Sequence, residues 1–114
     1  MKTENCGSTY APATASAVNT ELMTSLAELF KLFGDSTRIR ILTLLDSSEM
    51  CVCEISERLG MTESAVSHQL AILRQADLVR VTRKGKSLIY ALSDDHVRYM
   101  LDMALLHMAE KERG

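Results

Sequence analysis

The sequence predicts a mainly helical domain that carries one small β-hairpin. Apolar residues recur at helical spacing through most of residues 20–78 and again from residue 95 onward. Between these stretches they alternate with polar residues, as is typical of strands. The chain has 114 residues, 46% of them hydrophobic, which is enough for one compact core. We therefore expect one domain over residues 19–114.

Residues 1–18 are predicted to form a flexible N-terminal arm. They are rich in Ser, Thr, Ala and Gly, include Pro12 and Cys6, and show no sustained period. No run of 18 apolar residues and no signal-peptide pattern occurs, so we expect a cytoplasmic protein that does not enter the membrane. In that reducing compartment, an odd set of three cysteines is more typical of metal ligands or reactive thiols than of disulfides.

The predicted helices have recognisable starts and stops. The first begins at residue 19 or 20 and ends at Gly34, and Asp35 or Ser36 caps the second. A short third helix around Val52–Leu59 ends at Gly60, and a fourth runs from residue 63 to about residue 75, with Thr62 as its cap. Two helices joined by a short turn that contains glycine form a helix-turn-helix. The outer face of the fourth helix carries polar side chains that suit contact with base edges: Ser64, Ser67, His68 and Gln69.

A basic hairpin follows the fourth helix. Apolar residues alternate at positions 79 and 81 and then at 88, 90 and 92, and Gly85 permits the positive φ of a tight turn. The tip is flanked by Arg83, Lys84 and Lys86. Residues 58–90 contain six basic residues against two acidic ones, although the formal net charge of the chain is −2. This basic wing on an acidic chain indicates contact with the phosphates of double-stranded DNA.

The last predicted helix opens at Asp94 or Asp95 and runs to about Glu112. Its apolar face is broad for so small a domain: Val97, Met100, Leu101, Ala104, Leu105 and Met108. We expect this face to be shared with a second protomer, which makes the protein a homodimer through its terminal helices.

The helix order, the phrase TESAVSHQLAILRQADLV, the basic hairpin and the terminal helix together resemble the ArsR/SmtB family of metal-sensing repressors. The resemblance covers about residues 22–110, and SAVSHQL is quite specific among winged helix proteins. It implies a winged helix-turn-helix in which Ser64, Ser67 and His68 enter the major groove. It also implies that the hairpin tip reaches the adjacent backbone or minor groove.

Four possible metal ligands lie along the terminal helix: Asp94, His96, His107 and Glu110. Eleven residues return a helix to within about 20° of its starting direction but advance it by about 16 Å, so one ion cannot join His96 to His107 within a chain. Two such helices packed antiparallel across a two-fold axis would create two identical four-ligand sites. Two imidazoles and two carboxylates suit tetrahedral Zn²⁺, with Co²⁺ or Cd²⁺ as competitors. The spacing also resembles the interprotomer site of the family at all four positions.

A second candidate site is the sequence Cys51-Val52-Cys53. It resembles the box from which thiolate-binding members of the family take ligands for Cd²⁺, Pb²⁺, Bi³⁺ or As³⁺. In a regular helix the two side chains point about 200° apart, so joint binding requires an extended or frayed first turn. Cys6 could add a third sulfur, although the cadmium- and lead-sensing branch has two cysteines in its arm. A buried small side chain or a redox-active pair stays open as the alternative.

The sequence thus predicts a transcriptional repressor that binds operator DNA as an apo homodimer and is released by Zn²⁺ or a similar ion (Cd²⁺, Co²⁺ or Pb²⁺). The alternative keeps the fold but senses As³⁺, Cd²⁺, Pb²⁺ or reactive sulfur through Cys51 and Cys53, with or without Cys6. An enzyme is not expected, because four protein ligands leave no open position on the metal and no base or nucleophile lies nearby in the sequence.

Overall fold

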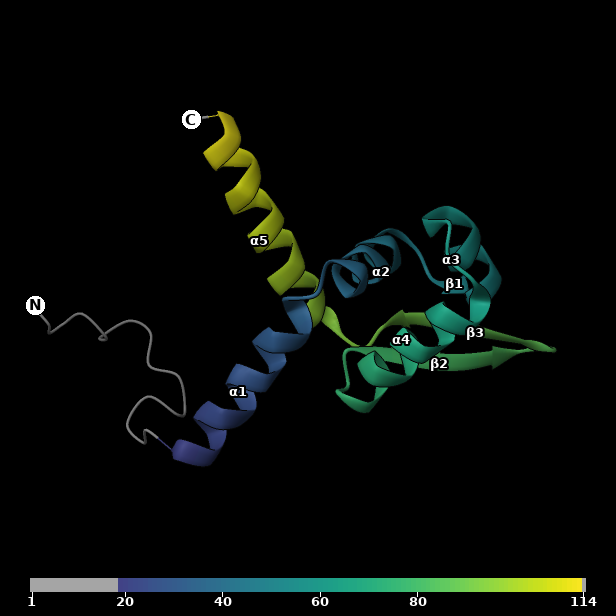
Figure 1. Cartoon of the computed structure of the whole chain (residues 1–114), viewed down its shortest axis with the longest axis horizontal. Helices are drawn as coiled ribbons and strands as arrows, with labels where there is room; N and C mark the ends of the chain where they lie inside the picture. Colours follow the sequence, from purple (N-terminus) through teal and green to yellow (C-terminus); the bar gives the residue numbers. More distant parts are fainter. Residues whose placement is uncertain (1–18, 114) are drawn as a thin grey trace, which may run out of the picture. The chain divides into compact units, whose positions relative to one another are not determined.

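The computed structural model describes residues 19–113 and has the element order of a winged helix-turn-helix (Figure 1). The predicted arm, with Cys6, lies outside the described residues. The elements are α1 (Thr20–Phe33), α2 (Ser36–Ser47), β1 (Met50–Cys51), α3 (Val52–Leu59), α4 (Glu63–Gln75), β2 (Val79–Lys84), β3 (Ser87–Leu92) and α5 (Asp95–Arg113). The predicted fold class is therefore confirmed.

Helix α1 is capped by Asn19, whose side-chain oxygen accepts a hydrogen bond from the Leu22 amide at 3.1 Å. Glu21 in the first turn and Lys31 in the last complement the helix dipole. The helix buries none of its residues, and its large apolar side chains stay exposed: Leu22, Met23, Leu26 and Phe30. Such a stripe is typical of a helix that packs against another surface.

The helix-turn-helix follows the local signals in the sequence. Gly60 ends α3 in the left-handed conformation, with φ 67°, and the Thr62 hydroxyl accepts a hydrogen bond from the Ala65 amide at 3.1 Å at the start of α4. The residues that α2, α3 and α4 turn toward one another are almost completely buried: Ile41, Leu42, Leu45, Ile55, Val66, Leu70 and Leu73. This core fixes α4 with its polar face outward.

The hairpin forms as predicted, with Val79 opposite Leu92, Lys84 opposite Ser87, and Gly85 at φ 63° in the turn. A third strand, β1, was not predicted. It pairs Met50 with Tyr90 and Cys51 with Ile89, so the sheet order is β1-β3-β2. Two residues are too few to show an alternating pattern, and their strand conformation depends on pairing with β3, about 40 residues away.

Helix α5 is anchored at its start and exposed beyond it. Val97 and Leu101 are 4% and 3% exposed, and this part of the helix packs on α2 and β3. The large apolar side chains of the remaining surface are open to solvent in the single chain: Tyr99, Met100, Met103, Leu105, Leu106 and Met108. Among residues 19–113, no helix is long and apolar enough to span a membrane.

Candidate DNA interface and metal sites

The predicted recognition residues lie on α4, and one of them differs from the others in burial and in its hydrogen bond. Ser64, Ser67 and His68 are exposed. Gln69 is half-buried, and its side-chain oxygen accepts a hydrogen bond from Arg38 Nε on α2 at 3.0 Å. This hydrogen bond uses one of the two lone pairs of the Gln69 amide oxygen and restrains the side chain, and sequence spacing could not reveal a partner 31 residues away.

The cations of the wing also differ from one another. All three are exposed, but Lys84 Nζ lies 2.6 Å from the Oε1 atom of Glu49. The Lys84 ammonium, as hydrogen-bond donor and as nearby charge, lowers the pKa of the Glu49 carboxyl. Glu49 thus stays ionised and offsets part of the charge that Lys84 would offer to DNA.

A cleft of about 370 Å³ lies between α4 and β3, beside the recognition face. Ser67 lines it together with residues outside the predicted DNA-contacting set: Leu70, Ala71, Arg74, Gln75 and Tyr90. The register of β3 places Tyr90 opposite Val81, so both side chains lie on one face of the hairpin. The cleft adds the cationic Arg74 and the Tyr90 hydroxyl to the polar groups beside the predicted recognition residues.

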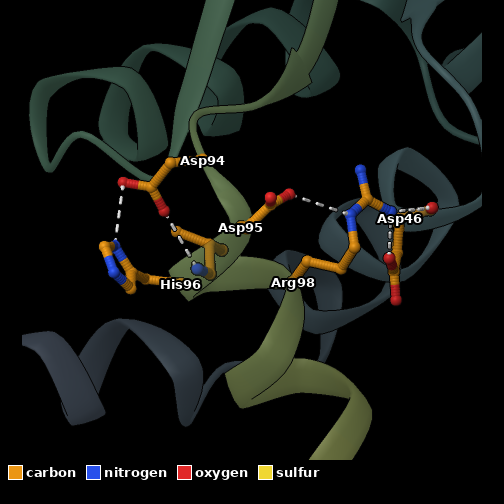
Figure 2. Close-up of polar contacts among 6 residues, drawn as sticks. Asp46, Asp94, Asp95, His96 and Arg98 are labelled. Carbon is orange, nitrogen blue, oxygen red and sulfur yellow. Dashed lines mark hydrogen bonds and ion pairs between the residues drawn. The ribbon is translucent and has the colours of Figure 1, made fainter.

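The start of α5 brings together the first two predicted metal ligands (Figure 2). Asp94 Oδ1 accepts a hydrogen bond from the Val97 amide at 3.1 Å, and Asp94 Oδ2 lies 3.7 Å from His96 Nδ1. The hydrogen bond from Val97 lowers the pKa of Asp94, so the carboxylate is charged at neutral pH. The His96 side chain is 91% exposed and free to turn toward an ion.

The other two predicted ligands, His107 and Glu110, lie exposed near the far end of the same continuous helix. Eleven residues of helix separate His96 from His107 by about 16 Å along the axis. Within residues 19–113 of one chain, no three His, Cys, Asp or Glu side chains gather closely enough to hold a metal ion. A four-ligand site on α5 therefore requires a second chain.

Replacing Asp94 tests its role as the cap of α5. We expect Asp94→Ala to unfold at lower urea than the wild type, because the Val97 amide loses its acceptor, whereas Asp94→Ser keeps a cap oxygen and unfolds near the wild-type midpoint. Because folding lowers the Asp94 pKa, its charge-dependent stabilisation is present above the unfolded pKa and is lost as pH falls through the folded pKa.

Urea unfolding between pH 2 and pH 7 measures this charge-dependent contribution of Asp94 to stability. Asp94→Ser should lose the Asp94 contribution to the acid dependence while keeping the stability at pH 7. An unchanged acid dependence in that variant would contradict the assignment.

The cysteines of the second candidate site lie close together. Cys51 Sγ is 3.4 Å from Cys53 Sγ and 3.4 Å from Glu54 Oε1, and Glu54 Oε1 also accepts a hydrogen bond from the Cys51 amide at 3.1 Å. The predicted helix over Val52–Leu59 is confirmed, and Cys51 is the last residue of β1 and the N-cap of that helix, with extended φ −85° and ψ 168°. This supplies the extended geometry that a shared ligand pair requires. Hydrogen bonding to Cys51 raises the pKa of Cys53.

Residues 35–81 match the model of the arsR family of bacterial regulatory proteins. The chain is 38% identical over 87 residues to the transcriptional repressor SmtB homolog of Synechocystis, covering 76% of this chain and 66% of that protein. It is 36% identical over 97 residues to the regulator NmtR of Mycobacterium tuberculosis, covering 85% and 81%. The crystal structure of AntR, an antimony-specific transcriptional repressor, superposes with a TM-score of 0.75 at 29% identity, covering 92% of this chain and 97% of that one. The chain therefore belongs to the ArsR family of winged helix-turn-helix regulators.

Proposed function

We propose that this protein is a homodimeric repressor that binds operator DNA and leaves it when Zn²⁺ or a similar ion binds between two α5 helices. The ligands are Asp94 and His96 of one protomer with the residues equivalent to His107 and Glu110 of the other. The observation that carries the proposal is the placement of the two ligand pairs at opposite ends of one continuous helix. The names of the relatives, a repressor in SmtB and an antimony-specific repressor in AntR, support the same class of function.

The pattern along α5 supports an antiparallel pairing. Five residues follow one another at intervals of four, three, four and three, which is a single stripe on a helix: His96, Met100, Met103, His107 and Glu110. Met100 and Met103 are 38% and 62% exposed in the single chain. A two-fold axis between these methionines would bury them against their copies. It would also bring the start of each helix beside the end of the other, where the ligands are.

The donor set fits a zinc-class ion. Each shared site offers two imidazoles and two carboxylates, and four protein ligands in tetrahedral arrangement are typical of zinc sites that do not catalyse reactions. The bound ion would supply a cross-link between protomers. Asp94 and His96 are the ligands that the fold fixes relative to the helix-turn-helix, because the adjacent Val97 is buried in its core.

Zinc and operator affinities measured together test this function. We expect zinc to weaken operator binding, and operator DNA to weaken zinc binding by the same factor, because coupling between two binding sites is reciprocal. Fluorescence anisotropy of labelled operator and competition with a zinc chelator give the two affinities. The His96→Gln variant is the control, and it should bind operator without responding to zinc. Equal operator affinities with and without zinc would exclude the proposed release.

The wing offers a matched pair of variants. We expect Arg83→Ala to reduce the magnitude of the negative slope of log K against log salt by about 0.9, because one phosphate contact is lost. Lys84→Ala should reduce the magnitude of the slope less, because the Glu49 carboxylate, 2.6 Å from the Lys84 ammonium, already offsets part of its charge. Operator titrations between 50 and 300 mM salt measure both slopes. Equal losses would show that the Lys84–Glu49 ion pair opens on DNA.

A second candidate sensor is favoured by the 3.4 Å separation of the Cys51 and Cys53 sulfurs. Here Cd²⁺, Pb²⁺ or As³⁺ would bind the two thiolates, with Glu54 beside them. Cys51→Ser with Cys53→Ser should then abolish the response to these ions and leave the zinc response intact. X-ray absorption on the cadmium-loaded protein distinguishes the two sites, because a sulfur-rich shell indicates the cysteines and a shell of nitrogen and oxygen indicates α5.

A further inference from the structure

We propose that α2 is the relay between the metal site and the recognition helix, held to α5 by Arg98 and Asp46 and to α4 by Arg38 and Gln69. Arg98 and Arg38 are positioning residues in this proposal: neither binds the ion, and each holds one helix against another. The inference rests on the proposed function and adds the route by which an ion on α5 reaches α4.

The first link joins the start of α5 to the end of α2 (Figure 2). Arg98 Nη1 lies 2.5 Å from Asp46 Oδ1 and 2.5 Å from the Asp46 backbone carbonyl oxygen. That carbonyl is in the last turn of α2, where helix carbonyls lack intrahelical donors and a cation is favourable. The Asp46 side chain is only 15% exposed and that of Arg98 39%. This ion pair is therefore better shielded from solvent than the Lys84–Glu49 pair of the wing, whose side chains are 60% and 43% exposed.

The link between Arg98 and Asp46 lies close to the proposed metal ligands along α5. Arg98 follows His96 by two residues and Asp94 by four, so it lies within one helical turn of both proposed ligands. Interaction with the Asp46 carboxyl also raises the pKa of Asp102, one turn further along α5. Any displacement of the first turns of α5 by a bound ion must therefore move the end of α2 or break these contacts.

The second link joins the other end of α2 to the recognition helix. Arg38 Nε donates to Gln69 Oε1 at 3.0 Å, and both side chains are partly buried. Arg38 lies in the first turn of α2, which Asp35 caps by accepting a hydrogen bond from the Arg38 amide at 3.0 Å. Gln69 directly follows His68, one of the residues expected in the major groove. The side chain of Arg38 thus holds a recognition-helix residue to the well-capped start of α2.

The body of α2 is suited to move as one unit. Ile41, Leu42 and Leu45 are 0–1% exposed, so the helix between the two links is packed in the core. Arg38 and Asp46 are eight residues apart, about 12 Å along the helix. A rigid helix with a polar link at each end transmits a displacement from one end to the other. A measurement of the energetic coupling between the two links tests whether α2 transmits a displacement in this way.

The experiment compares the coupling ratio, the operator Kd with zinc divided by the operator Kd without it, in variants of full-length protein. We expect Arg98→Met to lower this ratio by between about twofold and thirtyfold, the range for residues along a coupling network. Zinc affinity, measured without DNA, should stay within about twofold of the wild type, because Arg98 is not a ligand. Arg98→Lys should restore part of the ratio, since the cation returns without the planar geometry.

The double variant tests the relay itself. If both links serve one route, Arg98→Met combined with Arg38→Met lowers the ratio no further than the stronger single variant. Arg40→Met is the matched control: Arg40 is also on α2, but its guanidinium contacts the Leu59 carbonyl on α3 at 3.4 Å, and its loss should leave the ratio unchanged.

Three results would overturn the relay: an unchanged ratio in Arg98→Met, an equal loss in Arg40→Met, or additive losses in the double variant. Should Arg98→Met fold poorly, Asp46→Asn tests the same link while leaving the guanidinium and the backbone carbonyl in place. A wild-type ratio of one would contradict the proposed function instead, so the two failures are distinguishable.

Discussion

Mixing the His96→Gln and His107→Gln variants should restore one zinc site per dimer, whereas each variant alone should bind no zinc at its α5 sites. In each homodimer both sites lack a ligand. In the mixed dimer one site carries both substitutions, but the other combines the intact start of α5 from the His107→Gln chain with the intact end from the His96→Gln chain. The expected recovery follows from the helix geometry, which keeps the two histidines about 16 Å apart within a chain.

Two affinity tags isolate the mixed dimer after subunit exchange, and zinc is counted by chelator competition at micromolar concentration. The matched control mixes His96→Gln with Asp94→Ser. Both of these substitutions affect the start of α5, so neither site of that mixed dimer is complete and no zinc should bind. Zinc binding at the α5 sites of either single variant, or none at those sites in the first mixture, would contradict a site shared between chains.

Leu70→Ala in the recognition helix should destabilise the fold by about 2–5 kcal/mol. Leu70 is 0% exposed and lies between Val66 and Leu73 on the buried face of α4. The matched control is Leu88→Ala on β3, where the same truncation removes a side chain that is 43% exposed. We expect the control to cost less than about 0.5 kcal/mol.

Urea unfolding at one fixed protomer concentration measures both variants, because the stability of a dimer depends on concentration. The Leu70→Ala variant should also lose operator binding in proportion to its unfolded fraction. Similar losses of stability in the two variants would show that the buried face of α4 contributes little to the fold.

The parts of the fold that depend on local signals could be predicted from the sequence. Thr62 and Gly60 mark the helix-turn-helix turn, and Gly85 marks the hairpin, because caps and turns depend on residues within four positions. Strand β1 could not be predicted, because its two residues are extended only through pairing with β3. The conformation of Cys51, and with it the approach of the two sulfurs, depends on that pairing.

Some features of the candidate site could likewise be predicted from the sequence, and others could not. Helical spacing alone placed His96 and His107 on one face and predicted that they cannot meet within a chain. The partners of Gln69, Lys84 and Arg98 were not predictable, because these contacts span 31, 35 and 52 residues of sequence. Within residues 19–113, each of these three contacts gives one side chain a partner that its neighbours of the same type in the sequence pattern lack.

The two carboxylate oxygens of Asp94 have different partners: one receives the Val97 amide and the other faces His96. The first turn of α5 is consequently formed without an ion, and in the proposed site the Asp94 carboxylate would already be held in place while the exposed His96 ring turned toward the ion. Little conformational entropy is then lost on binding, which favours affinity. If zinc binds as proposed, loading with zinc should leave the far-ultraviolet circular dichroism unchanged, and its effect on operator binding would come from a change of position between pre-formed helices and not from folding.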